Sequence, residues 1–379
     1  MGPQYQLAMR RLAKAGIAHA LQRTGADALL DALAGARGLP VVLGYHNVVE
    51  DAGAYAGGAL PGMMISRRML AQHLDWLGRR FRFVSLDELG ERLLSGNGGG
   101  RPLAAVTFDD GYRDVYAHAF PLLREKGIPA AVFVVTDLMG TTDIPLYDRL
   151  YLLLAGAAAA NRPVTRDLRG LFLGLGLPVP QIAPLDGGGW DPVAVTRFLL
   201  GTFPQDQLRQ AVDALGAHVE IDERAFLARL PLTWEMAAEM SRAGITIGSH
   251  TRTHPVLTLE SEQKVLAEVA GSRRVLEHTL GIPVRHFAYP GGGYNRDTVR
   301  AVAAAGYRFA YTTCRHRDAE HPLLTVPRTL LWETSSVDVR GRFSAAVMSC
   351  QVRGMFTPRC RGPHGAAGGG LPRAGAVHP

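Results

Sequence analysis

The sequence predicts an α/β fold with parallel strands, and two repeats of one pattern carry this prediction. Apolar runs of strand length occupy 103–108 and 129–136, with a helical pattern between them. The same order returns at 244–250, where a strand is followed by a helix over 259–280 and a strand over 286–290. Strands joined through a crossover helix run parallel, so both stretches are expected to lie in a parallel sheet.

The remaining elements extend this array on both sides. The valine-rich segment 40–49 predicts a strand, and a helix is expected to begin at Ser66. A capping box at 85–88 marks the start of another helix. Beyond the second repeat, the pattern predicts a helix over 295–305 and a strand over 309–314.

The strand–helix rhythm divides the chain into regions. We expect the α/β domain to occupy 39–136 and 233–340, interrupted by a helical insertion over 137–232 that lies over the active-site face. Residues 1–38 read as an amphipathic helical leader, which either packs on the domain or attaches to a membrane surface. The Gly-, Pro- and Arg-rich segment 341–379 is expected to be irregular and disordered.

Composition excludes several classes of function. The chain has 379 residues, of which 47% are hydrophobic and 20% charged, as in a soluble globular protein. Its net charge of +7 is scattered rather than gathered into a stripe, so no nucleic-acid partner is expected. No run of about 18 apolar residues predicts a transmembrane segment. No signal peptide is recognisable, which makes the cytoplasm the expected location.

The motif "TFDDG" places Asp109 and Asp110 side by side at the end of a predicted strand. Taken alone, such a pair is typical of a helix N-cap beside a solvated neighbour. A bound cation would remove the repulsion between the two carboxylates. One carboxylate would then bind the ion while the other takes a proton.

A second motif, "SHTRTHP", places His250 and His254 after another predicted strand. These histidines either lie in a surface loop or bind a metal, and Pro255 disfavours helical geometry at residue 254. Two imidazoles and one carboxylate form a catalytic metal site with positions left open for water. Because the carboxyl ends of parallel strands share one face, the two motifs are expected to meet.

The third motif, "RHFAYPGGGY", follows the same rule at 285–294. Arg285 is a candidate for orienting a nearby carboxylate. The glycines after Pro290 let backbone N–H groups approach a ligand closely, although a plain Pro-Gly turn accounts for them equally well.

In this order, "TFDDG", "HTRTH" and "RHFAYPGG" resemble the first three motifs of the polysaccharide deacetylase family, also called the NodB-homology family or carbohydrate esterase family 4. The resemblance covers about 40–335, apart from the insertion. It implies a distorted (β/α) barrel of the NodB type and hydrolysis of N-acetyl groups on an N-acetylhexosamine glycan. It also implies a role for each matching position: Asp109 as general base; Asp110, His250 and His254 as ligands of a divalent metal, most often Zn²⁺; Arg285 as the partner of Asp109; and the Gly291 N–H as an oxyanion donor.

The general acid is the open assignment. Its candidates are His46, which ends the first apolar strand, and His316 and His321, which lie in the charged stretch "CRHRDAEHP". We favour His46, because a histidine that precedes the acidic motif resembles the poly-N-acetylglucosamine deacetylase branch of the family. Three other functions stay open: an O-acetyl polysaccharide esterase, an inactive glycan-binding relative, and a metal-dependent glycosyltransferase, which would leave the histidine pair unexplained.

Overall fold

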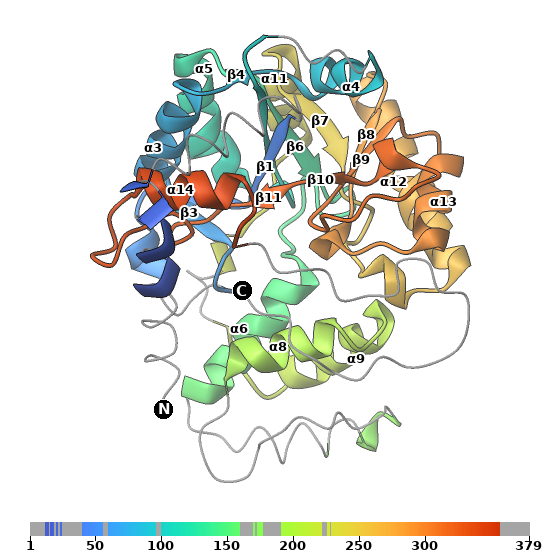
Figure 1. Cartoon of the computed structure of the whole chain (residues 1–379). Helices are drawn as coiled ribbons and strands as arrows, with labels where there is room; N and C mark the ends of the chain where they lie inside the picture. Colours follow the sequence, from blue (N-terminus) through green and yellow to red (C-terminus); the bar gives the residue numbers. More distant parts are fainter. Residues whose placement is uncertain are drawn as a thin grey trace.

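A parallel sheet forms the centre of the molecule (Figure 1). The computed structural model describes residues 40–55, 60–95, 100–159, 191–221 and 229–356, with short stretches within 12–24, 170–176 and 226–227. Within these ranges nine strands form one sheet in the order β10-β9-β8-β7-β6-β5-β1-β11, and β4 also pairs with β5. Every pairing is parallel. The strands are β1 (Val41–Tyr45), β4 (Arg82–Phe83), β5 (Leu103–Phe108), β6 (Ala130–Val134), β7 (Thr246–Ser249), β8 (His286–Ala288), β9 (Phe309–Thr312), β10 (Val326–Pro327) and β11 (Thr329–Leu330).

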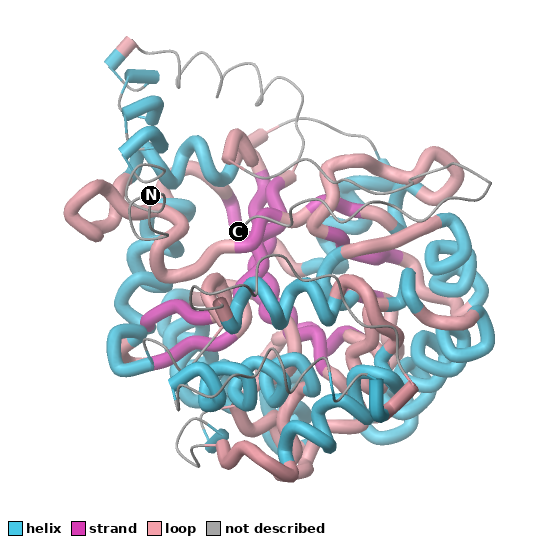
Figure 2. The backbone as a smooth tube through the Cα atoms, turned by 90° about the horizontal axis from the view of Figure 1, so that it is seen from below, coloured by secondary structure: helices cyan, strands magenta, loops and turns pink. Residues whose placement is uncertain are grey.

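The two edges of this sheet are brought together by one short segment. Strand β10 pairs with β9 at one edge, and β11 pairs with β1 at the other. Only Arg328 separates β10 from β11 in the chain. The two edges of the sheet therefore come together at Arg328, and the sheet curves into a nearly closed barrel. Figure 2 shows the strands gathered at the centre with helices around them. The predicted distorted (β/α) barrel is therefore confirmed.

Local signals set the helix boundaries. The Ser66 side chain accepts a hydrogen bond from the Met69 N–H at the start of α3, and Gly127 ends α5 with a φ of 62°. Asn295 and Thr298 form a reciprocal capping box at the start of α13. The helices of the barrel are α3 (Arg67–Gly78), α4 (Leu86–Ser95), α5 (Phe120–Lys126), α11 (Trp234–Arg242), α12 (Glu262–Leu280) and α13 (Arg296–Ala304), with a π-helix, η2 (Val115–Ala119), before α5.

The segment expected to be an insertion contains three described helices with a core of their own. These are α6 (Leu146–Ala159), α8 (Pro192–Leu200) and α9 (Gln205–Gly216), which lie beneath the barrel in Figure 1. Their apolar side chains form a cluster separate from the barrel core, with Leu150, Leu199 and Leu208 among its buried members. The carboxyl ends of the strands face these helices, and side-chain hydrogen bonds join the helices to the loops that follow the strands.

The expectation that residues 341–379 are irregular and disordered is wrong for part of that range. Residues 345–352 form helix α14 (Ala345–Val352), which is almost wholly buried. The Ser344 side chain caps it by accepting a hydrogen bond from the Val347 N–H. Apolar burial and this cap fix a helix that the low periodicity of the sequence concealed. The remainder of the expected tail, 357–379, lies outside the described residues.

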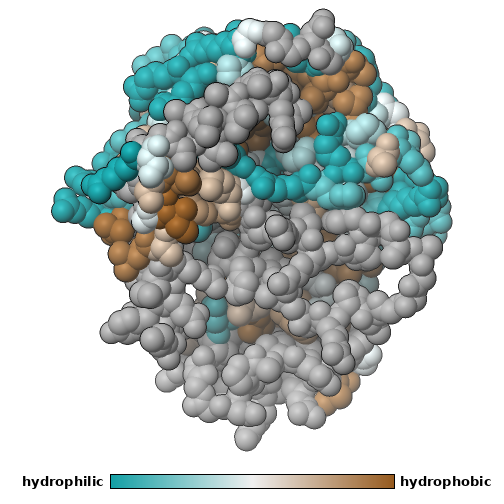
Figure 3. Space-filling view, viewed as in Figure 1, coloured by the Kyte–Doolittle hydropathy of each residue, from teal (hydrophilic) through white to brown (hydrophobic). Residues whose placement is uncertain are grey.

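The N-terminal leader is described only in part. The described residues between 12 and 23 are helical, and Ala18 packs against α14. Leu12 and Ile17 are more than half exposed. Figure 3 shows an apolar patch on the left side of the molecule, next to a hydrophilic projection. Among the helices that the structure describes, none combines the length and hydropathy needed to cross a bilayer. Attachment of the leader to a membrane surface stays a prediction.

Candidate active site

Three predicted ligands converge at the carboxyl ends of β5 and β7. The Oδ1 atom of Asp110 lies 3.4 Å from Nε2 of His250 and 3.2 Å from Nε2 of His254. One donor atom of each residue lies within 4.8 Å of the other two. The carboxylate and the His250 ring are almost fully buried, while His254 keeps 13% of its side chain exposed. Solvent therefore reaches the site on the side of His254.

The backbone at this site is held in an unusual conformation. Among the described residues other than glycine, positive φ values occur only at Asp110 (70°), Thr251 (70°) and His254 (61°). Each such residue costs about 1–3 kcal/mol and persists only where its surroundings enforce it. Here the His250 N–H donates to the Val134 carbonyl, and the His254 N–H donates to Oγ1 of Thr251. These contacts hold the ligands in orientations that the isolated backbone would disfavour.

The donor set fits a divalent metal ion. Oδ1 of Asp110 is buried without a hydrogen-bond partner, which is costly unless a cation or donor satisfies it. Two ligands of a tetrahedral zinc ion lie about 3.3 Å apart, close to the separations found here. Nδ1 of His250 lies 2.7 Å from the Ala288 carbonyl, so Nδ1 is the protonated nitrogen and the Nε2 lone pair faces Asp110. Nitrogen and carboxylate donors of this kind suit zinc and its neighbours.

The neighbouring carboxylate, Asp109, is paired with an arginine that the motifs did not indicate. Arg328 donates from both terminal nitrogens, Nη1 to Oδ1 and Nη2 to Oδ2, each at 2.7 Å. Arg328 also donates to Oγ1 of Thr107 at 3.0 Å, and its side chain is 1% exposed. This buried, bidentate pair fixes the carboxylate plane.

The expectation that Arg285 pairs with Asp109 is wrong. Arg285 precedes β8, so it lies at the amino end of the strand, whereas Asp109 follows the carboxyl end of β5. The Arg285 side chain is 42% exposed and contacts Asp87 at 3.2 Å. The signal for the true partner was Arg328 itself, a lone charge within the otherwise uncharged run "LLTVPRTLLW".

His46 faces both carboxylates. It follows β1, and its Nε2 atom lies 4.0 Å from Oδ2 of Asp109 and 3.9 Å from Oδ2 of Asp110. Its side chain is 12% exposed, on the same side as the metal ligands. The two other candidates for the general acid lie on the segment after β9, where His316 is exposed and the backbone N–H of His321 donates to Asp318.

Gly291 lies at the same end of the sheet, in the short helix η4 (Pro290–Gly292) after β8. Its φ of 64° is one that glycine adopts freely. A Cβ at this position would meet no atom within 4 Å, so the backbone borders open space. Its role as an oxyanion donor stays a prediction.

The charges of the site keep both carboxylates ionised. Burial raises the pKa of Asp109, but the Arg328 guanidinium outweighs it and the pKa falls below its usual value. Burial likewise opposes ionisation of Asp110, but the neighbouring imidazoles of His250 and His254 outweigh it and hold the pKa of Asp110 well below the usual range. Burial lowers the pKa of His46, and the two carboxylates only partly restore it.

The insertion adds a residue that the motifs also left out. The hydroxyl of Tyr147 donates to Oδ2 of Asp110 at 2.8 Å, and its ring lies 4.9 Å from the His254 ring. Tyr147 belongs to α6, in the run "LYDRLYLLL", whose apolar pattern predicts only a helix. Nothing in the sequence near Tyr147 indicates contact with a residue 37 positions earlier.

Comparisons with known proteins identify relatives of this chain. The polysaccharide deacetylase family model matches residues 96–159 and 189–310. Over 82 residues, or 22% of this chain and 29% of the relative, the chain is 34% identical to a putative polysaccharide deacetylase, YxkH, of Bacillus subtilis. Over 70 residues, or 18% and 15%, it is 36% identical to chitin deacetylase 1 of Cryptococcus neoformans. These matches span less than a third of either curated relative.

A solved structure shares the fold. The Streptococcus pyogenes deacetylase PplD, in complex with acetate, aligns with a TM-score of 0.50 at 18% identity, over 80% of this chain and 95% of that one. At this identity the likeness speaks for the fold alone. The family is shown by the matched family model and the curated relatives, and the motifs at the barrel rim agree with it. The chain belongs to the polysaccharide deacetylase family.

Proposed function

We propose that this protein is a metal-dependent hydrolase that removes N-acetyl groups from an N-acetylhexosamine-containing polysaccharide. The observation that carries the proposal is the convergence of Asp110, His250 and His254 beside a second, separately held carboxylate, Asp109. Hydrolysis of an acetyl amide needs an activated water, a base and an acid, and this rim provides a residue for each role. The name of the matched chitin deacetylase supports an N-acetylated substrate.

Asp110, His250 and His254 would hold the ion, which we propose to be zinc. When bound, such an ion lowers the pKa of a water and stabilises negative charge on an acyl oxygen. Imidazole and carboxylate also bind other divalent first-row metals. Metal analysis of the purified protein identifies the ion.

Asp109 is the proposed general base. Arg328 occupies both of its oxygens and lowers its pKa, so the carboxylate is ionised and held in one orientation before substrate binds. His46 lies within 4.0 Å of Asp109 and is the proposed acid for the leaving amine. A histidine at the end of the first strand favours the poly-N-acetylglucosamine branch.

Acetate release from N-acetylglucosamine oligomers tests the proposal. We expect release by the wild-type protein, loss with a chelator, and recovery on adding zinc. Asp109→Asn should keep its metal and lose about 10²–10⁴-fold in rate, since that is the usual contribution of a general base. Asp110→Asn is the matched control, because it should lose the metal as well.

The same assay discriminates the alternatives. Release from O-acetylated but not N-acetylated glycans would replace the amidase assignment by an esterase. If Asp109→Asn retains the wild-type rate, Asp109 is not the base. Glycan binding without acetate release under any metal condition would leave only a binding function.

A further inference from the structure

The helical insertion contacts the metal ligands directly. Tyr147 lies in the first turn of α6, and its hydroxyl donates to Oδ2 of Asp110 at 2.8 Å. The other oxygen, Oδ1, is the one that faces Nε2 of His250 and of His254. The two oxygens of Asp110 are therefore divided between two tasks, one toward the phenol and one toward the imidazoles.

A buried chain of contacts fixes the Tyr147 hydroxyl in turn. It is in contact with the hydroxyl of Tyr112, which donates to Oδ2 of Asp148 at 2.6 Å. Asp148 forms an ion pair with Arg229, whose Nε lies 3.3 Å from Oδ1. Arg229 and Asp148 have only 1% and 3% of their side chains exposed. Tyr147 thus has little freedom to leave Asp110.

The Tyr147 hydroxyl acts toward Asp110 as a hydrogen-bond donor, because an ionised carboxylate oxygen can only accept.

The insertion also contacts the histidine loop. Gln205, the first residue of α9, donates from Nε2 to the Thr253 carbonyl at 2.5 Å, and its Oε1 lies 2.8 Å from Oγ1 of Thr253. Thr253 precedes His254. The barrel supplies the counterpart, since Glu268 of α12 accepts hydrogen bonds from the Thr253 N–H and hydroxyl. The insertion therefore contacts both loops that carry metal ligands.

We propose that Tyr147 is a positioning residue for the metal site, whose hydroxyl holds Asp110 so that Oδ1 alone is presented to the ion. The inference rests on the metal site of the proposed function. It assigns the insertion a role in metal affinity in addition to any role in shaping the substrate cleft. Partners of metal ligands typically contribute a factor of about 10–100 to affinity, because they orient the ligand before the ion arrives.

Zinc affinity of Tyr147→Phe tests the proposal without any substrate. Competition with a chromophoric chelator should show affinity about 10–100-fold below that of the wild type. Replacement of zinc by Co²⁺ gives a second readout, because its visible absorption reports coordination geometry. We expect the cobalt spectrum of Tyr147→Phe to change as the carboxylate reorients.

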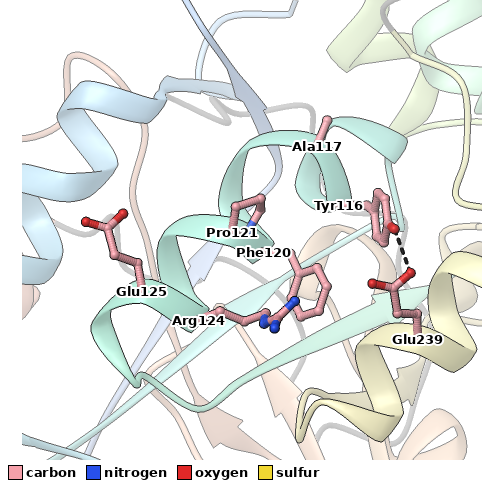
Figure 4. Close-up of a pocket in the computed structure, with 7 residues that line it drawn as sticks. All are labelled: Tyr116, Ala117, Phe120, Pro121, Arg124, Glu125 and Glu239. Atoms are coloured by element: carbon pink, nitrogen blue, oxygen red, sulfur yellow. Dashed lines mark hydrogen bonds between the residues drawn. The ribbon is translucent and has the colours of Figure 1, made fainter.

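Tyr116→Phe is the matched control. Tyr116 also donates its hydroxyl to a carboxylate, Glu239, at 2.7 Å, but it does so on the outer surface between η2 and α11 (Figure 4). This pair lines a shallow surface depression with Phe120 and Arg124 and has no part in the rim. Removal of the Tyr116 hydroxyl should leave zinc affinity and the cobalt spectrum unchanged.

The possible outcomes distinguish a failure of the role of Tyr147 from a failure of the proposed function. Wild-type affinity in Tyr147→Phe, or an equal loss in Tyr116→Phe, overturns the role of Tyr147. Metal-free unfolding curves check that Tyr147→Phe is folded. Should it not be, Tyr147→Met replaces it, because its side chain fills the buried space without a donor; the same loss is expected, and wild-type affinity in that variant likewise overturns the role of Tyr147. A wild-type protein that binds no zinc overturns both proposals. Zinc binding without acetate release overturns only the proposed function.

Discussion

At the scale of single residues, Arg328 has the role that the third motif indicated for Arg285. Arg328 is buried against Asp109, and we expect Arg328→Ala to lower the free energy of unfolding by about 3–5 kcal/mol, because it leaves a carboxylate buried without its partner. We also expect turnover to fall about 100-fold, since the base loses its fixed orientation. Denaturant unfolding and acetate release measure the two effects.

Arg285→Ala is the control for this prediction. Its partner Asp87 is half exposed, and surface ion pairs contribute at most about 1 kcal/mol. Turnover should stay at the wild-type level, because the pair lies at the amino end of the strands. A large loss of activity in Arg285→Ala, with little in Arg328→Ala, would make Arg285 the functional arginine after all.

The choice of general acid is a second prediction at this scale. His46→Ala should lose about 10²–10⁴-fold in turnover while retaining its metal, because His46 faces the two carboxylates but is not one of the converging ligands. His316→Ala and His321→Ala should retain turnover. Acetate release and metal content, measured on all three variants, decide the assignment. Loss confined to either of the latter two would exclude His46.

The residues of the site that could be predicted from the sequence are those whose chemistry restricts the residue type. Asp110, His250 and His254 could be predicted because metal ligation allows few donors and because strand ends share one rim. Arg328 and Tyr147 could not be predicted in the same way. Their roles depend on closure of the sheet at β10 and β11 and on the docking of α6, and neither arrangement is encoded in a short motif.

At the scale of elements, His73 links helix α3 to two other segments. Its Nδ1 lies 3.2 Å from the Tyr45 hydroxyl of β1, and its Nε2 lies 2.5 Å from Oγ of Ser336. Burial lowers the pKa of His73 to about 3. In the unfolded chain the pKa is near 6.5, so only the unfolded state takes up this proton between these values.

We therefore expect the free energy of unfolding to fall as pH decreases below about 6.5. Between about pH 6.5 and 5 the contribution of His73 is about 2 kcal/mol. It should appear as a steeper pH dependence of the wild type than of His73→Gln in urea unfolding. Equal slopes in the wild type and His73→Gln would refute the contribution.

Element prediction succeeded where local signals were strong. The caps at Ser66, Gly127 and Asn295 mark helix ends that the structure reproduces. The two-residue strands β10 and β11 escaped prediction, because pairing partners far apart in the chain define them rather than their own pattern. Helix α14 escaped for a related reason, since burial on all sides removes the periodicity that identifies a surface helix.

At the scale of the whole molecule, a bound ion would connect distant parts of the chain. Asp110 follows β5, whereas His250 and His254 follow β7, so an ion held by all three restrains two segments about 140 residues apart. An unfolded chain presents no such site. Zinc at about 1,000 times its Kd should then stabilise the folded state by about 4 kcal/mol.

This stabilisation should raise the unfolding temperature by roughly 5–10 °C relative to protein in chelator, as calorimetry can measure. His254→Ala should lose the rise, because it removes a ligand. Asp109→Asn should keep it, because Asp109 is held by Arg328 rather than directed at the imidazoles. A rise that survives in His254→Ala would mean that zinc stabilises the fold from another position. The positive φ values at Asp110 and His254 would then be strain without a metal to justify it.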